Sequence, residues 1–217
     1  MHPIRCLVTA GPTREFFDPV RFISNPSSGR MGFALAEAAA KAGWEVTLVA
    51  GPVALAAPEG VEREDVVSAE DMFRAVDSRF DACDILIMSA AVSDYRPREI
   101  QPQKVKKSKL EMTIEMEPTR DILKTVAARK TPAQYVVGFA AETGDVVSYA
   151  LGKMLAKNCD LMVANRVGGP VGGFMSDDNI VTLLGRDGFR EEIGPAPKTF
   201  IAGKIVCAIS AALSLRA

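Results

Sequence analysis

The sequence predicts an α/β fold with a doubly wound, mostly parallel sheet, and two features of the chain support this prediction. Short apolar runs without polar alternation recur along the chain, which is typical of strands buried on both faces of a parallel sheet. Helical stretches separate these runs. The alternation of strands and helices indicates a layered α/β domain in which helices cover the sheet.

The expected strands are short and apolar, and glycine–proline pairs end two of them. They occupy residues 4–10, 46–50, 61–67, 84–91, 135–140 and 161–164, of which 61–67 has the weakest pattern. Gly11-Pro12 follows the first strand and Gly51-Pro52 follows the second. Such pairs interrupt regular structure, so both strands should end there.

Four helices are expected between and after these strands. Residues 28–42 are rich in alanine and should end at Gly43. The second helix begins at Ser68, an N-cap residue with Asp71 three positions later, and apolar residues at helical spacing follow it. Residues 145–157 fit a third helix, and residues 198–215 fit the last one.

The C-terminal part departs from the parallel pattern. Residues 180–184 and 189–193 flank a short polar segment with Asp187-Gly188 as its turn, which predicts a β-hairpin. The whole chain of 217 residues has no internal repeat or low-complexity linker, and its length suffices for a sizeable core. We therefore expect one domain over residues 1–217, with a Rossmann-like sheet and a C-terminal β-hairpin.

Composition excludes several classes of protein. The formal net charge is −1, whereas a nucleic-acid-binding domain normally carries a strongly basic surface. The hydrophobic share of 48% and the near-neutral charge are unlike those of a disordered chain. No apolar run approaches the roughly 18 residues that a membrane helix needs. The N-terminus lacks the layout of a signal peptide, so we expect a cytoplasmic protein.

The four cysteines are far apart, and each lies beside apolar residues: Cys6, Cys83, Cys159 and Cys207. The chain has a single histidine and no CxxC pair, so a zinc site is not expected. We interpret the four cysteines as buried thiols in a reducing compartment.

A basic segment interrupts the alternation of strands and helices. Residues 96–109 contain six lysines and arginines against Glu99 alone, together with Pro97 and Pro102. The segment follows a predicted strand, and ligands of open α/β sheets bind beyond the carboxyl ends of strands. We expect a flap, about residues 92–109, that closes over an anionic ligand. A solvated run of charges is the alternative.

The segment before the first helix is a candidate phosphate site. Ser27 and Ser28 are suited to capping, and Gly29 allows a ligand to approach the backbone closely. A helix N-terminus offers unpaired N–H groups and the positive end of the helix dipole. The alternative is an ordinary serine cap. The segment matches neither a P-loop nor the GxGxxG turn of dinucleotide-binding folds.

Two further positions carry suitable chemistry. Asp94 follows the strand at 84–91, where a carboxylate accepts hydrogen bonds from a ribose, a base or hydrated Mg²⁺; a turn-forming aspartate is the alternative. Lys153 and Lys157 are spaced to share one helix face and one polyphosphate, although exposed lysines at this spacing are commonly just solvated. Tyr149 and Lys153 also match the Tyr-x-x-x-Lys pair of short-chain dehydrogenases, but the dinucleotide turn of that family is missing.

The ordered motifs of the chain resemble those of phosphopantothenoylcysteine synthetase, in the bacterial, CTP-using form that serves coenzyme A biosynthesis. They run in the same order from Val8 to Leu184. The motifs are Gly11-Pro12-Thr13-Arg14-Glu15, Asp18-Pro19-Val20-Arg21, Ile23-Ser24-Asn25, Ser27-Ser28-Gly29-Arg30-Met31-Gly32, Ala90-Ala91-Val92 with Asp94-Tyr95-Arg96, Lys104-Val105-Lys106-Lys107, Gly138-Phe139-Ala140-Ala141-Glu142-Thr143, Lys153, Lys157, Asp160, Val163-Ala164-Asn165, Phe174 and Asn179.

This resemblance implies a ligase with two half-reactions. The carboxylate of 4′-phosphopantothenate attacks the α-phosphate of CTP and releases pyrophosphate, with Mg²⁺ assisting. The amine of L-cysteine then attacks the acyl-cytidylate and releases CMP. By resemblance, Lys104 in the flap reaches the phosphates and Asn25 handles the acyl-cytidylate. The positions that the resemblance assigns to nucleotide binding are Met88, Ser89, Ala90, Asp94, Arg120, Asp121, Ile122, Leu123, Phe139, Lys153 and Lys157.

The sequence departs from the family at two places and leaves several expectations resting on the resemblance. Ser93 stands where alanine is frequent, and Arg120 stands where proline is frequent. The resemblance further implies a homodimer and, in most bacteria, fusion behind a flavin-dependent decarboxylase, so the chain is either a stand-alone enzyme or an excised domain. An NAD(P)-dependent oxidoreductase and a non-catalytic nucleotide-binding module are the alternative functions.

Overall fold

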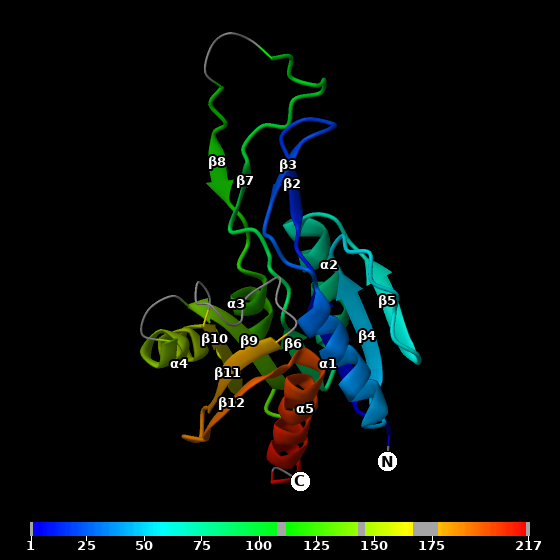
Figure 1. Ribbon diagram of the computed structural model, residues 1–217, viewed down its shortest axis with the longest axis vertical. Helices are drawn as coiled ribbons and strands as arrows, with labels where there is room; N and C mark the ends of the chain where they lie inside the picture. Colours follow the sequence, from blue (N-terminus) through cyan, green and yellow to red (C-terminus); the bar gives the residue numbers. More distant parts are fainter. Residues whose placement is uncertain (1, 108–111, 143–145, 167–177, 216–217) are drawn as a thin grey trace.

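A mostly parallel sheet forms the centre of the molecule (Figure 1). The computed structural model describes residues 2–107, 112–142, 146–166 and 178–215. In these residues the main sheet has the strand order β12-β11-β10-β9-β6-β1-β4-β5. Its members are β1 (Arg5–Ala10), β4 (Glu45–Ala50), β5 (Val61–Asp65), β6 (Ile85–Met88), β9 (Tyr135–Glu142), β10 (Leu161–Arg166), β11 (Asp178–Gly185) and β12 (Arg190–Pro197).

The direction of the strands confirms the predicted fold class. The six strands from β10 to β5 in that order are parallel, and β11 and β12 add an antiparallel hairpin to the β10 edge. Val8 of β1 lies between Leu48 of β4 and Ile87 of β6. The chain therefore builds the sheet outward from β1 in one direction and then returns to build it in the other. This reversal makes the carboxyl ends of β1 and β6 the expected binding crevice.

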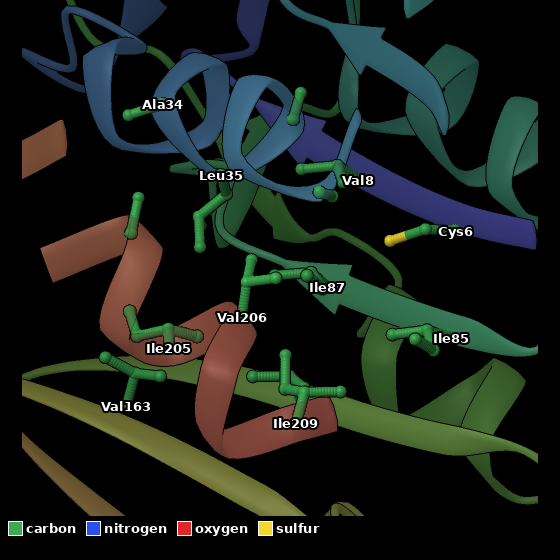
Figure 2. Close-up of a cluster of buried hydrophobic side chains, with 14 of the residues drawn as sticks. Cys6, Val8, Ala34, Leu35, Ile85, Ile87, Val163, Ile205, Val206 and Ile209 are labelled. Carbon is green, nitrogen blue, oxygen red and sulfur yellow. The ribbon is translucent and has the colours of Figure 1, made fainter. Parts of the chain in front are cut away.

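Helices cover both faces of the sheet. α1 (Arg30–Lys41) and α5 (Lys198–Ser214) lie on one face, where Leu35, Val206 and Ile209 meet strand residues such as Ile87 (Figure 2). α2 (Ala69–Phe80), α3 (Ile122–Ala127) and α4 (Val146–Ala156) lie on the opposite face, in a second cluster of buried residues. Both faces of the parallel strands are thus buried, as their uninterrupted apolar sequences predict.

Two short hairpins form an arm that projects from the layered body (Figure 1). β2 (Arg14–Phe16) pairs with β3 (Phe22–Ser24), and β7 (Tyr95–Pro97) pairs with β8 (Met116–Pro118). The backbone N–H of Gln101 donates to the carbonyl of Phe17 at 2.9 Å, which joins the two hairpins. The expected flap therefore begins as a strand. Strands of three residues are too short to give a recognisable apolar period, and the sequence did not predict them.

Local sequence patterns predict most helix ends correctly, but the predicted start of the first helix was wrong. Ser68 and Asp71 form the predicted capping box at the start of α2. α1 starts at Arg30 rather than at residue 28, because Gly29 has a left-handed backbone (φ 77°) and no side chain caps the helix. The ordinary serine cap, which was the alternative to a phosphate site, is therefore absent. In the described part of the chain, no helix combines the length and the apolar character needed to cross a bilayer.

The expectation of four buried cysteines was wrong at one position. Cys6, Cys83 and Cys159 are buried, whereas Cys207 is exposed on the outer face of α5. Burial raises the pKa of Cys83 and of Cys159 to about 12. The apolar neighbours of Cys207 in the sequence are poor guides, because adjacent residues of a helix point in different directions.

Candidate active site

A cavity of about 430 Å³ is lined by residues of β6, β9 and β10. Segments from distant parts of the chain converge on it. They include the loop before α1, the residues after β6 and the C-terminal end of α4. All of the predicted site residues except Lys104 line this cavity. They are Asn25, Ser27, Ser28, Gly29, Met88, Ser89, Ala90, Asp94, Arg120, Asp121, Ile122, Leu123, Phe139, Lys153 and Lys157.

Asn25 ties the loop before α1 to the segment after β6. Its Nδ2 donates to the carbonyl oxygens of Ala91 at 3.1 Å and of Val92 at 3.2 Å. The side-chain amide thereby fixes the loop before α1 relative to the segment after β6, and these two segments form opposite sides of the cavity. Aspartate at this position would lack the donor and would place a negative charge against two carbonyl oxygens, so the residue type matters for the shape of the cavity as well as for any contact with a ligand.

The start of α1 is built to accept an anion. Its first turn carries no acidic residue and receives no side-chain cap, and Ser27 Oγ accepts from the N–H of Gly29 at 3.3 Å, before the helix begins. Gly32 lets the helix approach the sheet, since a Cβ at that position would lie 2.5 Å from the Cβ of Ala10. The uncapped N–H groups and the helix dipole therefore face the cavity, where a phosphate group would satisfy them.

Hydrogen bonds from two threonines fix the segment that follows β6. The N–H of Ser93 donates to Thr13 Oγ1 at 3.0 Å, and Thr119 Oγ1 donates to the carbonyl of Ser93 at 2.6 Å. Thr13 is fully buried. These bonds hold the backbone immediately before Asp94, whose carboxylate is exposed and lines the cavity. Thr13 belongs to one of the motifs and Thr119 to none, and the contact of both with Ser93 depends on the tertiary structure.

The side chains next to α3 are partly engaged elsewhere. The guanidinium of Arg120 lies 4.1 Å from the centre of the Phe73 ring, and the carboxylate of Asp121 caps α3 and pairs with Lys157 at 3.2 Å. Contact between a ligand and residue 120 is therefore expected to use the backbone. Basic residues still outnumber acidic residues in the lining of the cavity. The basic residues are Arg30, Arg120, Lys153, Lys157 and Lys198, and the acidic ones are Asp94 and Asp121.

Lys104 lies in the flap, as the resemblance implies, but apart from the cavity. It is exposed on the arm and is absent from the residues that line the cavity of its own chain. The next residue, Val105, donates its N–H to Asp18 Oδ2 at 3.1 Å and accepts from the guanidinium of Arg21 at 2.6 Å. This clamp holds the flap against the β2–β3 hairpin. Tertiary hydrogen bonds of its neighbour thus keep Lys104 on the arm, and its contact with the phosphates stays a prediction.

Asp18 is the centre of this clamp, and its side chain is fully buried. Burial by itself would raise the pKa of this carboxyl. The side chain of Arg21 and the N–H groups of Val20, Arg21 and Val105 donate hydrogen bonds to it and outweigh burial, so its pKa lies well below the usual range.

Other residues test the remaining sequence interpretations. Tyr149 is 61% exposed and does not line the cavity, although Lys153 does, so the two do not form a dehydrogenase-like pair. The sequence analysis did not single out Lys198, which is 7% exposed and lines the cavity. A lysine at the first position of a helix is electrostatically unfavourable, and that anomaly was the one signal available. Phe174 and Thr143 lie outside the described residues.

Comparison with known proteins then decides the family. Residues 1–213 match the family described as DNA/pantothenate metabolism flavoprotein C-terminal domain, or DFP. This chain is a DFP domain. Over 206 residues it is 48% identical to the coenzyme A biosynthesis bifunctional protein CoaBC of Bacillus subtilis and 47% identical to that of Escherichia coli. Each alignment covers 94% of this chain and 50% of the relative, so the DFP domain spans about half the length of these relatives.

A solved structure gives the same assignment in three dimensions. The crystal structure of the C-terminal domain of CoaBC superposes on the DFP domain with a TM-score of 0.84 and 42% identity. The match covers 99% of this chain and 97% of that one. The family that the motifs predicted is therefore confirmed, as is the α/β fold with its antiparallel C-terminal strands.

Proposed function

We propose that this DFP domain joins 4′-phosphopantothenate to L-cysteine at the expense of CTP. The observation that carries the proposal is a cavity with more basic than acidic residues at the switch point of the sheet, beside an uncapped helix start, in a chain that belongs to the family of the CoaBC C-terminal domain. Two anionic substrates must meet in such a reaction, and the cavity supplies the positive charge that this meeting requires.

In the first half-reaction, a carboxylate oxygen of phosphopantothenate attacks the α-phosphorus of CTP. The bond from that phosphorus to the bridging oxygen breaks, and its electron pair leaves with pyrophosphate. The developing charge is offset by Lys153, Lys157 and the N–H groups at the start of α1. No side chain needs to act as a nucleophile.

Mg²⁺ would add to this charge neutralisation. The described residues contain no group of three histidine, cysteine or acidic side chains that could hold a metal. The exposed carboxylate of Asp94 fits the usual arrangement, in which Mg²⁺ is held by one or two carboxylates and by the phosphates of the substrate. When bound, the ion would act as a Lewis acid on the phosphates.

In the second half-reaction, the amine of cysteine attacks the acyl carbon of the cytidylate, loses a proton to solvent, and displaces CMP. We assign Asn25 to the acyl-cytidylate, because its amide joins the two walls of the cavity through Ala91 and Val92. An amide side chain orients an acyl or phosphoryl oxygen without adding charge. Phe139, which also lines the cavity, offers an apolar surface to the base.

A homodimer is the expected assembly, and the arm is its expected interface. Val20, Phe22, Ile23 and Ile100 are large apolar residues on the arm with exposures of 39 to 66%. Grouped exposed apolar residues are typical of interaction surfaces. Lys104 would then reach a cavity in one of two ways. Either the flap moves toward the cavity of its own chain, or Lys104 extends into the cavity of the second copy in the dimer. A decarboxylase half is a further expected partner, because the relatives are about twice as long.

The test mixes the protein with CTP, Mg²⁺, 4′-phosphopantothenate and L-cysteine, and measures pyrophosphate and CMP separately. Pyrophosphate should appear on addition of phosphopantothenate, and CMP should appear only after cysteine is added. A reaction without pyrophosphate above background would refute the ligase. Competition between CTP and ATP in the same assay measures base preference, which is expected to favour CTP. A protein that binds CTP without turnover would be the non-catalytic module instead.

A further inference from the structure

One corner of the cavity contains donors that the proposed reaction has not used. It lies where the strand β11 begins and where the helix α5 starts, next to the end of β10. Asn179 and Lys198 line it and are 3% and 7% exposed. Both are polar residues that are more than nine-tenths buried, and polar groups in such positions need hydrogen bonds or a counter-charge.

The amide nitrogen of Asn179 is available to a ligand. Its Oδ1 accepts from the N–H of Ile180 at 3.0 Å. Among the residues that the structure describes, Nδ2 of Asn179 has no hydrogen-bond partner, yet it is not one of the enclosed polar atoms. The small exposed part of this side chain thus includes a donor, and the residue lines the cavity.

The start of α5 adds positive potential to the same corner. Its N-cap is Pro197, no side chain caps it, and its first turn has no acidic residue. By contrast, the start of α2 has a complete capping box with Glu70 and Asp71 in its first turn. α5 extends over 17 residues, so its dipole is fully developed, and Lys198 adds a full charge at the end that already repels cations. An anion at this corner would interact favourably with the helix dipole and with the charge of Lys198.

We propose that Lys198, Nδ2 of Asn179 and the start of α5 bind the β- and γ-phosphoryl groups of the nucleoside triphosphate, and hold the pyrophosphate formed from them. This proposal rests on the proposed function and adds residues to it. α5 packs beside α1 on one face of the sheet (Figure 2), and the first residue of each helix, Arg30 and Lys198, lines the cavity. Lys153, Lys157 and α3 border the cavity from the opposite face.

This division assigns the two ends of the nucleotide. The nucleoside and α-phosphate contact the α3 and α4 side, where the predicted nucleotide positions lie. The terminal phosphates cross the sheet edge toward α1 and α5. Pyrophosphate carries more negative charge than a carboxylate, so two helix starts, Arg30 and Lys198 suit it better than the carboxylate of cysteine. Neutralising the leaving group lowers the barrier of the first half-reaction.

The test measures binding of inorganic pyrophosphate, CTP and CMP to the full chain by titration calorimetry with Mg²⁺ present. Lys198→Met keeps the length of the side chain and removes its charge. The substitution should weaken the binding of pyrophosphate and of CTP by about 10- to 100-fold, as expected for a lost charged hydrogen bond. The affinity for CMP should stay unchanged. Lys198→Arg should retain most of the affinity. Lys204→Met is the matched control, since Lys204 is exposed on the same helix, and should change nothing.

A second variant tests the site without touching the lysine. Asn179→Asp keeps the oxygen that accepts from Ile180 and replaces only Nδ2 with an anionic oxygen, so pyrophosphate should bind more weakly while thermal stability is retained. Equal weakening of CMP and CTP, or an effect confined to the KM for cysteine, would overturn the proposal. If pyrophosphate binding depends on Lys198 but no ligation occurs, the proposed function fails and the subsite stands.

Discussion

Gly32→Ala tests whether the close approach of α1 to the sheet shapes the cavity. The added Cβ would lie 2.5 Å from Ala10 Cβ and 2.8 Å from Ser89 Oγ. Ordinary contacts between carbon atoms are about 3.5–4.0 Å, so α1 must move by about 1 Å. Overpacking of this kind costs about 1–3 kcal/mol. The alanine regains about 1 kcal/mol of helix propensity, which offsets part of the cost.

Gly203→Ala is the matched control, because it is also a helical glycine and a Cβ there would meet no heavy atom within 4 Å. Gly203→Ala therefore gains helix propensity as Gly32→Ala does, but it introduces no steric clash. Urea unfolding should therefore place Gly32→Ala about 1–3 kcal/mol below Gly203→Ala in free energy of unfolding. Pyrophosphate release should fall as much as about 100-fold, because the first turn of α1 is displaced. Equal stability and full activity of the two variants would refute the reasoning.

Further outcomes are expected for other residues. Asp18→Asn should flatten the acid side of the stability profile measured by urea unfolding: the depressed folded-state pKa of this carboxyl gives stabilisation that is complete above about pH 4 and is lost as pH falls toward that pKa. A wild-type slope in the variant would contradict the clamp. Ser68→Ala should cost about 1 kcal/mol of unfolding free energy and leave turnover unchanged, because it breaks only the capping box; no loss of stability would show that the cap contributes nothing. Lys104→Ala should slow pyrophosphate release at unchanged stability, and Asn25→Asp should impair conversion of the acyl-cytidylate to amide; wild-type turnover in both would remove these two assignments. Iodoacetamide at mildly alkaline pH should modify Cys207 alone in the native protein and the other three cysteines only after unfolding, as mass spectrometry would show; modification of a second native cysteine would contradict the burial.

Several parts of the fold follow from neighbouring residues and were predictable. The apolar strands of the parallel sheet, the capping box at Ser68 and the turn at Asp187-Gly188 each depend on a few adjacent side chains. The three-residue strands of the arm were not predictable, because they are too short to display a period. The start of α1 was misplaced because the left-handed backbone of Gly29 ends the loop and cannot be inferred from composition.

The candidate site shows the same division. The helix start before α1 and the family resemblance together indicated fifteen residues that the structure brings around one cavity, although the spacing of these residues did not show that all of them would meet. Lys104 has a motif but lies on the arm, held there through Val105 and Asp18. Lys198 has no motif but lies in the cavity. Whether a charged side chain reaches a site depends on which distant segments its neighbours bind.

The sequence by itself determined the α/β class, the apolar strands, most helix limits and the family, because these depend on local patterns and on residues that are recognisable in order. The tertiary structure alone decided which charges face the cavity, where the flap is held, and which helix starts remain uncapped beside it. Backbone propensity, capping and turn formation act between near neighbours in the chain. The electrostatic field of a site is the sum over groups far apart in the chain, and it exists only once the chain has folded.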